Sequence, residues 1–116
     1  MSKDDAPGIF MIEKIIAFGP FQGILLCLEN TSPKSTQQQF DQYNLISSHA
    51  QDILRQASSH YFNKYNSSLQ GEHELEYLSL KEDSPEWELV FCMKGRFEYC
   101  IVEYTDLVLK EIYFDA

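Results

Sequence analysis

The 116-residue chain carries a formal net charge of −9, and 44% of its residues are hydrophobic and 14% aromatic. This apolar content predicts one folded domain over residues 1–116 and excludes a disordered chain. The excess of carboxylates excludes nucleic acid and anionic membrane surfaces as direct partners, because both attract clustered lysine and arginine.

The chain starts with the polar segment MSKDDAPG, which predicts a flexible tail over residues 1–8. This start lacks the basic and apolar regions of a secretory signal, so we expect a cytoplasmic protein. No run approaches the roughly 18 apolar residues that span a bilayer.

The first two predicted strands cover Ile9–Phe18 and Phe21–Glu29, and the Gly19-Pro20 dipeptide between them predicts a hairpin turn. Both strands are apolar on both faces, with few exceptions. Strands of this kind are usually central in a sheet or covered on both sides. The polar exceptions are Glu13, Lys14 and Gln22.

The next segment predicts one long amphipathic helix over about residues 36–65. Ser35 has the side chain of a helix N-cap, and Gln38 three residues later completes a capping box. Ser47-Ser48 and Ser58-Ser59 are the weak points for a bend. Apolar residues recur at steps of three and four, the helical period, namely Phe40, Tyr43, Leu45 or Ile46, Ala50, Ile53, Leu54, Ala57, Tyr61 and Phe62.

Four further strands are predicted after the helix, beginning with Glu72–Leu80. From Trp87 to Phe114, three strand-like runs alternate with two short polar breaks, which is typical of an antiparallel meander. Trp87 shares a face of its run with Leu89, Phe91 and Met93. A three-residue loop over 94–96 would place Phe97, Tyr99 and Ile101 on this face, and a two-residue turn would place them on the other. Both alternatives stay open.

The predicted fold is α+β, with strands and helix in the order ββαββββ. One helix packed on one face of an antiparallel sheet is the simplest arrangement of these elements. A single helix covers only part of a six-stranded sheet, so we expect a partly apolar outer face that a partner or a second copy could cover. The residues expected there are Val90, Cys92, Cys100 and Val102.

No motif for catalysis, a cofactor or a metal is present, so we predict a protein that is not an enzyme. The cysteines lack the C-x-x-C spacing of a zinc site and are predicted to be buried thiols, two of them close together on adjacent strands. The histidines lack the spacing of a helical zinc pair and are predicted to be ordinary, partly exposed residues. These residues are Cys27, Cys92, Cys100, His49, His60 and His73.

The negative charge is concentrated in the C-terminal part of the chain. Residues 72–116 hold twelve carboxylates and four basic side chains, so eight of the nine net negative charges lie there. The simple interpretation is solubility. The sharper hypothesis is a contact surface for a basic protein, with Trp87 in the core and two tyrosines as anchors. The predicted contact residues are Glu72, Glu74, Glu76, Asp83, Glu86, Glu88, Glu98, Glu103, Tyr104, Asp106, Glu111 and Tyr113.

With its acidic meander WELVFCMKGRFEYCIVEY, the chain resembles the small immunity proteins of bacterial toxin systems, including contact-dependent growth inhibition. The resemblance is one of size, acidity and α+β pattern over the whole chain. It implies that the protein binds and blocks one toxin domain, commonly a basic nuclease, without a cofactor. The alternative is a small binding module or homo-oligomer that uses an exposed sheet face without catalysis.

Overall fold

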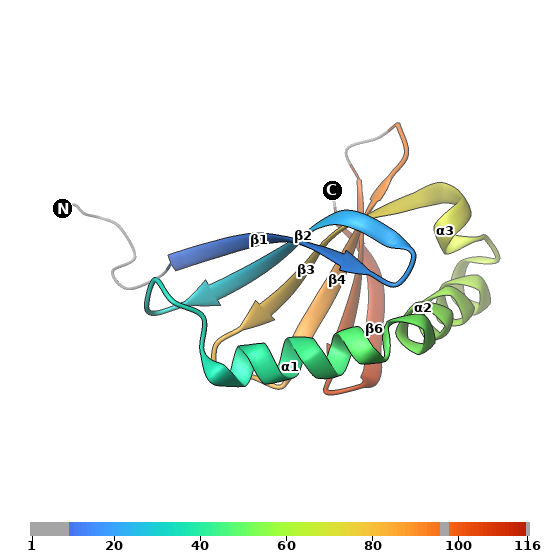
Figure 1. Ribbon diagram of the computed structural model, residues 1–116. Helices are drawn as coiled ribbons and strands as arrows, with labels where there is room; N and C mark the ends of the chain where they lie inside the picture. The colour runs from blue at the N-terminus through green and yellow to red at the C-terminus, as the bar shows by residue number, and fades with distance from the viewer. Residues whose placement is uncertain (1–9, 96–97, 116) are drawn as a thin grey trace.

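The computed structural model describes residues 10–95 and 98–115, which form an α+β fold (Figure 1). The tail predicted for residues 1–8 lies outside the described residues. Six strands form one sheet in the order β1-β2-β3-β4-β5-β6, and the helices lie on one of its faces. The elements are β1 (Phe10–Phe18), β2 (Phe21–Asn30), α1 (Gln37–Ser48), α2 (Ala50–Tyr65), α3 (Leu69–Glu72), β3 (His73–Lys81), β4 (Glu86–Met93), β5 (Tyr99–Thr105) and β6 (Val108–Asp115).

The sheet is antiparallel except between β2 and β3, which pair in parallel. The prediction of a wholly antiparallel sheet is therefore wrong at this one pair. The reason is the long helical connection, which carries the chain back to the end of the sheet where β2 began. A strand that starts from that end and lies beside β2 runs in the same direction.

The single helix predicted over residues 36–65 is wrong, because two helices, α1 and α2, occupy this range, and the short α3 follows them. The first break lies at His49, whose backbone angles (φ −112°, ψ 19°) leave the helical region. The carbonyl oxygen of Leu45 lies 2.8 Å from Ser48 Oγ and 3.0 Å from His49 Nδ1. These side chains compete with the backbone for that acceptor, which favours a break in the helix.

The start of α1 also differs from the prediction. The N-cap is Thr36, whose hydroxyl oxygen accepts a hydrogen bond from the Gln39 backbone N–H at 3.1 Å. Gln39 Oε1 accepts from the Thr36 N–H at 3.0 Å, so a capping box is present, but one residue later than predicted. Gln39 is buried, where it also bonds the Asn30 side chain. This tertiary contact selects the cap.

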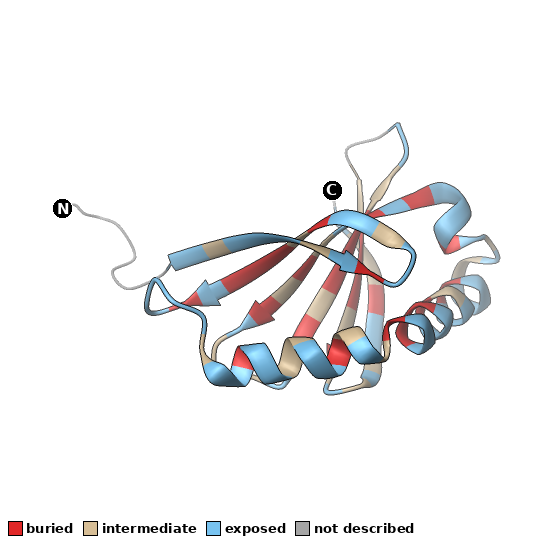
Figure 2. Cartoon of the chain, in the orientation of Figure 1, coloured by how far each residue is buried: buried red, intermediate tan, exposed pale blue. Residues whose placement is uncertain are grey.

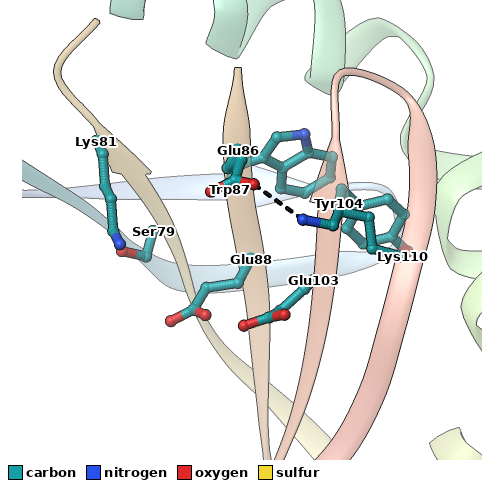
Figure 3. A pocket seen from close by; sticks show the side chains of 8 residues that line it. All are labelled: Ser79, Lys81, Glu86, Trp87, Glu88, Glu103, Tyr104 and Lys110. Atoms are coloured by element: carbon teal, nitrogen blue, oxygen red, sulfur yellow. Dashed lines mark hydrogen bonds and ion pairs between the residues drawn. The ribbon is translucent and has the colours of Figure 1, made fainter. Parts of the chain in front are cut away.

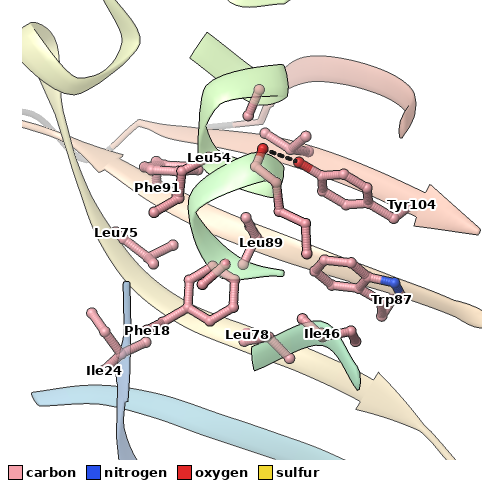
Figure 4. Packing of buried hydrophobic residues seen from close by; sticks show 14 of the residues in the cluster. Phe18, Ile24, Ile46, Leu54, Leu75, Leu78, Trp87, Leu89, Phe91 and Tyr104 are labelled. Carbon is pink, nitrogen blue, oxygen red and sulfur yellow. Dashed lines mark hydrogen bonds between the residues drawn. The ribbon is translucent and has the colours of Figure 1, made fainter. Parts of the chain in front are cut away.

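The core lies between the helices and one face of the sheet (Figures 2 and 4). Trp87 pairs across β4 and β5 with Tyr104, and their rings stack at 4.2 Å between centroids with 7° between planes. Phe91 pairs with Cys100 in the same register, which places Tyr99 and Ile101 on the opposite face from Trp87, as the two-residue alternative predicted. The connection itself is longer than two residues, because the Met93 N–H bonds to the Glu98 carbonyl oxygen, and Phe97 lies outside the described residues.

This register corrects the predicted outer face. Cys100 and Val102 point into the core, so only Val90 and Cys92 of the predicted group lie on the outer face. Cys92 and Cys100 therefore lie on opposite faces of the sheet, and the expected proximity of their side chains is wrong. The register between β4 and β5 determines which of their side chains point to the outer face, and so both corrections follow from it.

The prediction of a central or covered position for the N-terminal strand is wrong, since β1 is an edge strand. Phe10, Met11 and Ile15 have 42%, 58% and 75% of their surfaces exposed. The hairpin places β1 on one side of β2, and the helical crossover places β3 on the other, so β1 has no second neighbour among the described strands. Three members of the predicted helical stripe are also exposed, Phe40, Leu45 and Phe62.

Replacing Tyr104 with phenylalanine is expected to lower the free energy of unfolding by about 1 kcal/mol. The Tyr104 hydroxyl is buried and donates a hydrogen bond to the Ile53 carbonyl oxygen at 3.2 Å, which joins β5 to α2. The variant keeps the stacked ring but leaves the hydroxyl's place empty. Denaturant unfolding of both proteins measures the difference, and an unchanged value would contradict a stabilising role for this bond.

Candidate functional site

The sheet face opposite the helices, called the outer face below, carries two rows of side chains that cross all six strands. Among the residues that the structure describes, no helix lies over this face (Figure 1). Directly paired residues on neighbouring strands define each row, so the side chains stand next to one another. The acidic row consists of Glu13, Cys27, Ser79, Glu88, Glu103 and Glu111, and the apolar row of Ile15, Leu25, Tyr77, Val90, Ile101 and Tyr113.

The acidic row brings three carboxylates together on β4, β5 and β6. Glu88 pairs directly with Glu103, and Glu103 pairs directly with Glu111. Figure 3 shows the carboxylates of Glu88 and Glu103 side by side. Burial raises the pKa of Glu88, and the charge of Glu103 raises it further. Like charges directly opposite each other destabilise a sheet, so this arrangement opposes folding.

Beside the acidic row lies a cavity of about 60 Å³, lined by Glu88, Glu103 and Lys81 among others (Figure 3). Pockets that enclose small molecules usually measure several hundred Å³. The nearby Lys110 forms an ion pair with Glu86, with 2.9 Å between Nζ and Oε2. This ion pair lowers the pKa of Glu86. Lys81 therefore remains as the basic group closest to Glu88, whose pKa it lowers in part.

The apolar row supplies contact area next to the carboxylates through its half-buried tyrosines and its β1 and β2 residues, since Val90 and Ile101 are buried. Tyr113 is half-buried, and its hydroxyl donates a hydrogen bond to Glu103 Oε2 at 3.1 Å. Burial, followed by this bond, raises the pKa of Tyr113 to about 12. Tyr77 and Tyr99 are also half-buried on the same face. Partly exposed tyrosines beside charged groups are typical of the residues that dominate binding energy at protein interfaces.

Seven of the twelve predicted contact residues lie on the outer face. Glu74 pairs with Cys92, and Glu76 lies close enough to Cys92 to raise the pKa of its thiol. Glu86 lies two residues before Glu88 on the same face of β4 and is paired with Lys110. The other four belong to the two rows, namely Glu88, Glu103, Glu111 and Tyr113. The charge asymmetry of the sequence predicted these residues, and the strand pairing brings them together.

The outer face also contains residues that the sequence analysis missed. Glu13 and Glu29 come from the N-terminal hairpin, which carried little of the net charge and was not considered. Asp115, Tyr77 and Tyr99 complete the set. The alternation of buried Leu26 and Leu28 in β2 is the signal that could have placed Glu29 on the opposite face.

The other five predicted residues lie elsewhere. Tyr104 is fully buried in the core, so it has no surface with which to contact a partner. Glu72 accepts a hydrogen bond from the buried Tyr61 hydroxyl at 3.3 Å. Asp83 and Asp106 occupy turns with φ of 53° and 54°, a conformation that aspartate tolerates. Glu98 lies in the connection before β5.

The histidines provide no alternative site. His73 was predicted to be partly exposed but is 1% exposed, with its ring edge-on to Tyr61 at 5.4 Å between centroids. Within residues 10–95 and 98–115, no three His, Cys, Asp or Glu side chains are grouped so that they could hold a metal ion. Likewise, no helix in the described part of the chain combines the length and apolar character needed to cross a membrane.

Comparisons of the chain with protein-family models, with curated proteins and with solved structures gave no match. The function is therefore inferred from the geometry and charge of the outer face.

Replacing Glu88 with glutamine is expected to raise the free energy of unfolding at neutral pH by about 0.5 kcal/mol, because it removes one like-charge pair. Folding raises the pKa of Glu88 above its ordinary value of 4.5, so the folded state holds this proton more tightly than the unfolded state. The destabilisation is then absent well below pH 4.5 and grows as the pH rises above it.

The variant should therefore melt a few degrees above the wild type at about pH 7.5, and the difference should shrink by about pH 5. Glu74→Gln is the matched control, because Glu74 is exposed and pairs with Cys92 rather than with a carboxylate. Equal melting shifts for the two variants at neutral pH would contradict repulsion within the acidic row.

Proposed function

We propose that this protein is a cytoplasmic inhibitor that binds a basic domain of another protein through its outer face. The alignment of Glu88, Glu103 and Glu111 on a sheet face without a helical cover carries the proposal. Carboxylates that serve only solubility are best kept apart, since adjacent like charges weaken the fold. A partner's lysines or arginines would remove this repulsion on binding, so the arrangement favours the complex.

The remaining outer-face charges support the same partner chemistry. Nine carboxylates lie on this face, with Lys81 and Lys110 beside them and Lys94 at the end where β4 stops. A net negative surface of this kind accelerates association with a basic partner, and the half-buried tyrosines slow dissociation. The nine are Glu13, Glu29, Glu74, Glu76, Glu86, Glu88, Glu103, Glu111 and Asp115.

The size of the face fits a protein partner. Six strands at about 4.8 Å spacing and about 25 Å length form a face of roughly 600 Å². An ordinary protein interface covers about 800 Å² on each partner. The resemblance to immunity proteins points to a toxin domain as this partner, and a nuclease toxin has the basic cleft that such a surface would block.

The test is co-production with the protein encoded by the adjacent reading frame. A complex that forms at low salt, protects the cells from that protein and weakens as salt is added would support the proposal. Absence of a complex at low salt would contradict it. A complex that is insensitive to salt would contradict the acidic face as its basis, and would favour a binding module that uses the apolar row.

A further inference from the structure

The open edge of β1 is a second surface that a partner can occupy. β1 pairs with β2 on one side, and no other described strand pairs with it on the other. Such an edge presents unpaired backbone N–H and C=O groups, which another β-strand satisfies best. Its exposed apolar residues, Phe10, Met11 and Ile15, are available to the same strand.

The two edges of the sheet differ in their protection against pairing. Edge strands are usually guarded by bulges and by exposed charges. Each edge strand has one register shift against its neighbour, so the shifts do not distinguish the two edges. β6 exposes Lys110, Glu111 and Asp115, whereas β1 exposes only Glu13 and Lys14 among charged residues. Because β1 carries fewer charges and more exposed large apolar side chains than β6, it is the edge that another strand can pair with more readily.

We propose that β1 pairs in antiparallel orientation with β1 of a second copy, so that the two sheets become continuous in a homodimer. In this arrangement a two-fold axis passes through the middle of the strand pair, and both helix layers lie on the same side. Outer-face residues of one copy then oppose outer-face residues of the other.

Side-chain charge excludes two registers, and the exposure of Ile15 favours one of the others. An axis at Glu13 would oppose two glutamates, and an axis at Lys14 would oppose two lysines. An axis at Ile15 opposes the two Ile15 side chains and places Glu13 against Ala17 of the second copy. This register avoids like charges, joins residues 12–18 of both copies, and covers a side chain that is 75% exposed in the single chain.

The distribution of charge permits the approach of two acidic molecules at this edge. The charges of Glu13 and Lys14 cancel within β1. Glu29 on β2 pairs with Met11, outside the joined residues 12–18. The carboxylates of β4 lie three strand spacings away, or about 14 Å, which exceeds the screening distance of about 8 Å in physiological salt. The β1 edge is therefore a place where repulsion between copies is small.

The test is the mass of the protein in solution over concentrations from about 1 µM to about 200 µM. We expect the mass of two chains at high concentration, and Ile15→Lys should weaken dimerisation at least about 100-fold, because it opposes two lysines at the axis. Val108→Lys is the matched control, since Val108 is an exposed apolar residue of β6 and should leave the dimer intact. Ile15→Cys should form a covalent dimer on oxidation, beyond any formed by the wild type.

A wild-type mass of one chain at every concentration would overturn the proposal, as would a dimer that survives Ile15→Lys. Ile15 also belongs to the apolar row of the outer face, so the oligomeric state, and not the effect of Ile15→Lys on a basic partner, decides the homodimer. The result is separate from the proposed inhibitor function, because Glu103→Lys changes the outer face without touching β1.

Discussion

Replacing Trp87 with alanine should lower the free energy of unfolding by about 4 kcal/mol. The indole is 3% exposed, stacks on Tyr104 at 4.2 Å, and donates from Nε1 to the Asp106 carbonyl oxygen at 2.6 Å. The substitution removes the burial, the stacking and this bond together. Since a domain of this size has about 5–15 kcal/mol of stability, the variant should melt roughly 15 °C lower.

The substitution Trp87→Phe separates the contribution of the hydrogen bond to Asp106 from that of the buried, stacked ring. Phenylalanine retains a ring against Tyr104 but has no N–H for Asp106, so we expect a smaller loss of about 1–2 kcal/mol. Denaturant unfolding measured by circular dichroism gives both values. A Trp87→Ala protein within 1 kcal/mol of the wild type would show that the β4–β5 pair is not central to the core.

Reversing the charge of Glu103 should weaken binding to the proposed basic partner at least about 100-fold. Glu103 lies between Glu88 and Glu111, so a lysine there would present a positive charge to the partner at the centre of the acidic row. The same lysine would attract its two neighbouring carboxylates. The fold should therefore survive, although Tyr113 loses its hydrogen-bond acceptor.

Asp41→Lys is the matched control for this reversal. Asp41 is exposed on α1, on the helical side of the protein, and the substitution changes the net charge by the same amount. Calorimetric titration against the adjacent-frame protein at low and moderate salt should show a small change for Asp41→Lys and a large one for Glu103→Lys. Equal losses would mean that net charge, and not the outer face, governs the association.

The binding face could be predicted only in part. The clustering of carboxylates after residue 72 pointed to Glu88, Glu103 and Glu111, because charge is visible in the sequence without knowledge of the fold. Tyr104 was misassigned because a tyrosine suits both a core and an interface. Tyr104 lies directly opposite Trp87 on the neighbouring strand. This position depends on the length of the β4–β5 connection, which could not be predicted from the local sequence.

The N-terminal hairpin could likewise be predicted only in part from the sequence. Its two apolar runs and the Gly19-Pro20 turn between them correctly predicted two paired strands. Its place in the sheet could not be predicted, because the strand order follows from the path of the helical crossover over the sheet. The apolar character of both faces of β1 was therefore taken for burial, while the structure places the strand at an edge.

By itself, the sequence determined that this protein has an acidic α+β fold of six strands with helical segments between the second and the third, since periodicity and charge are local properties of the chain. Only the tertiary structure decided which strands are neighbours, which of the alternating residues in each strand face the helices, and where the helix breaks. These features depend on contacts between distant residues, such as Gln39 with Asn30 and Trp87 with Tyr104. The alignment of carboxylates across β4, β5 and β6 belongs to this second group, because it exists only once the strands are in register.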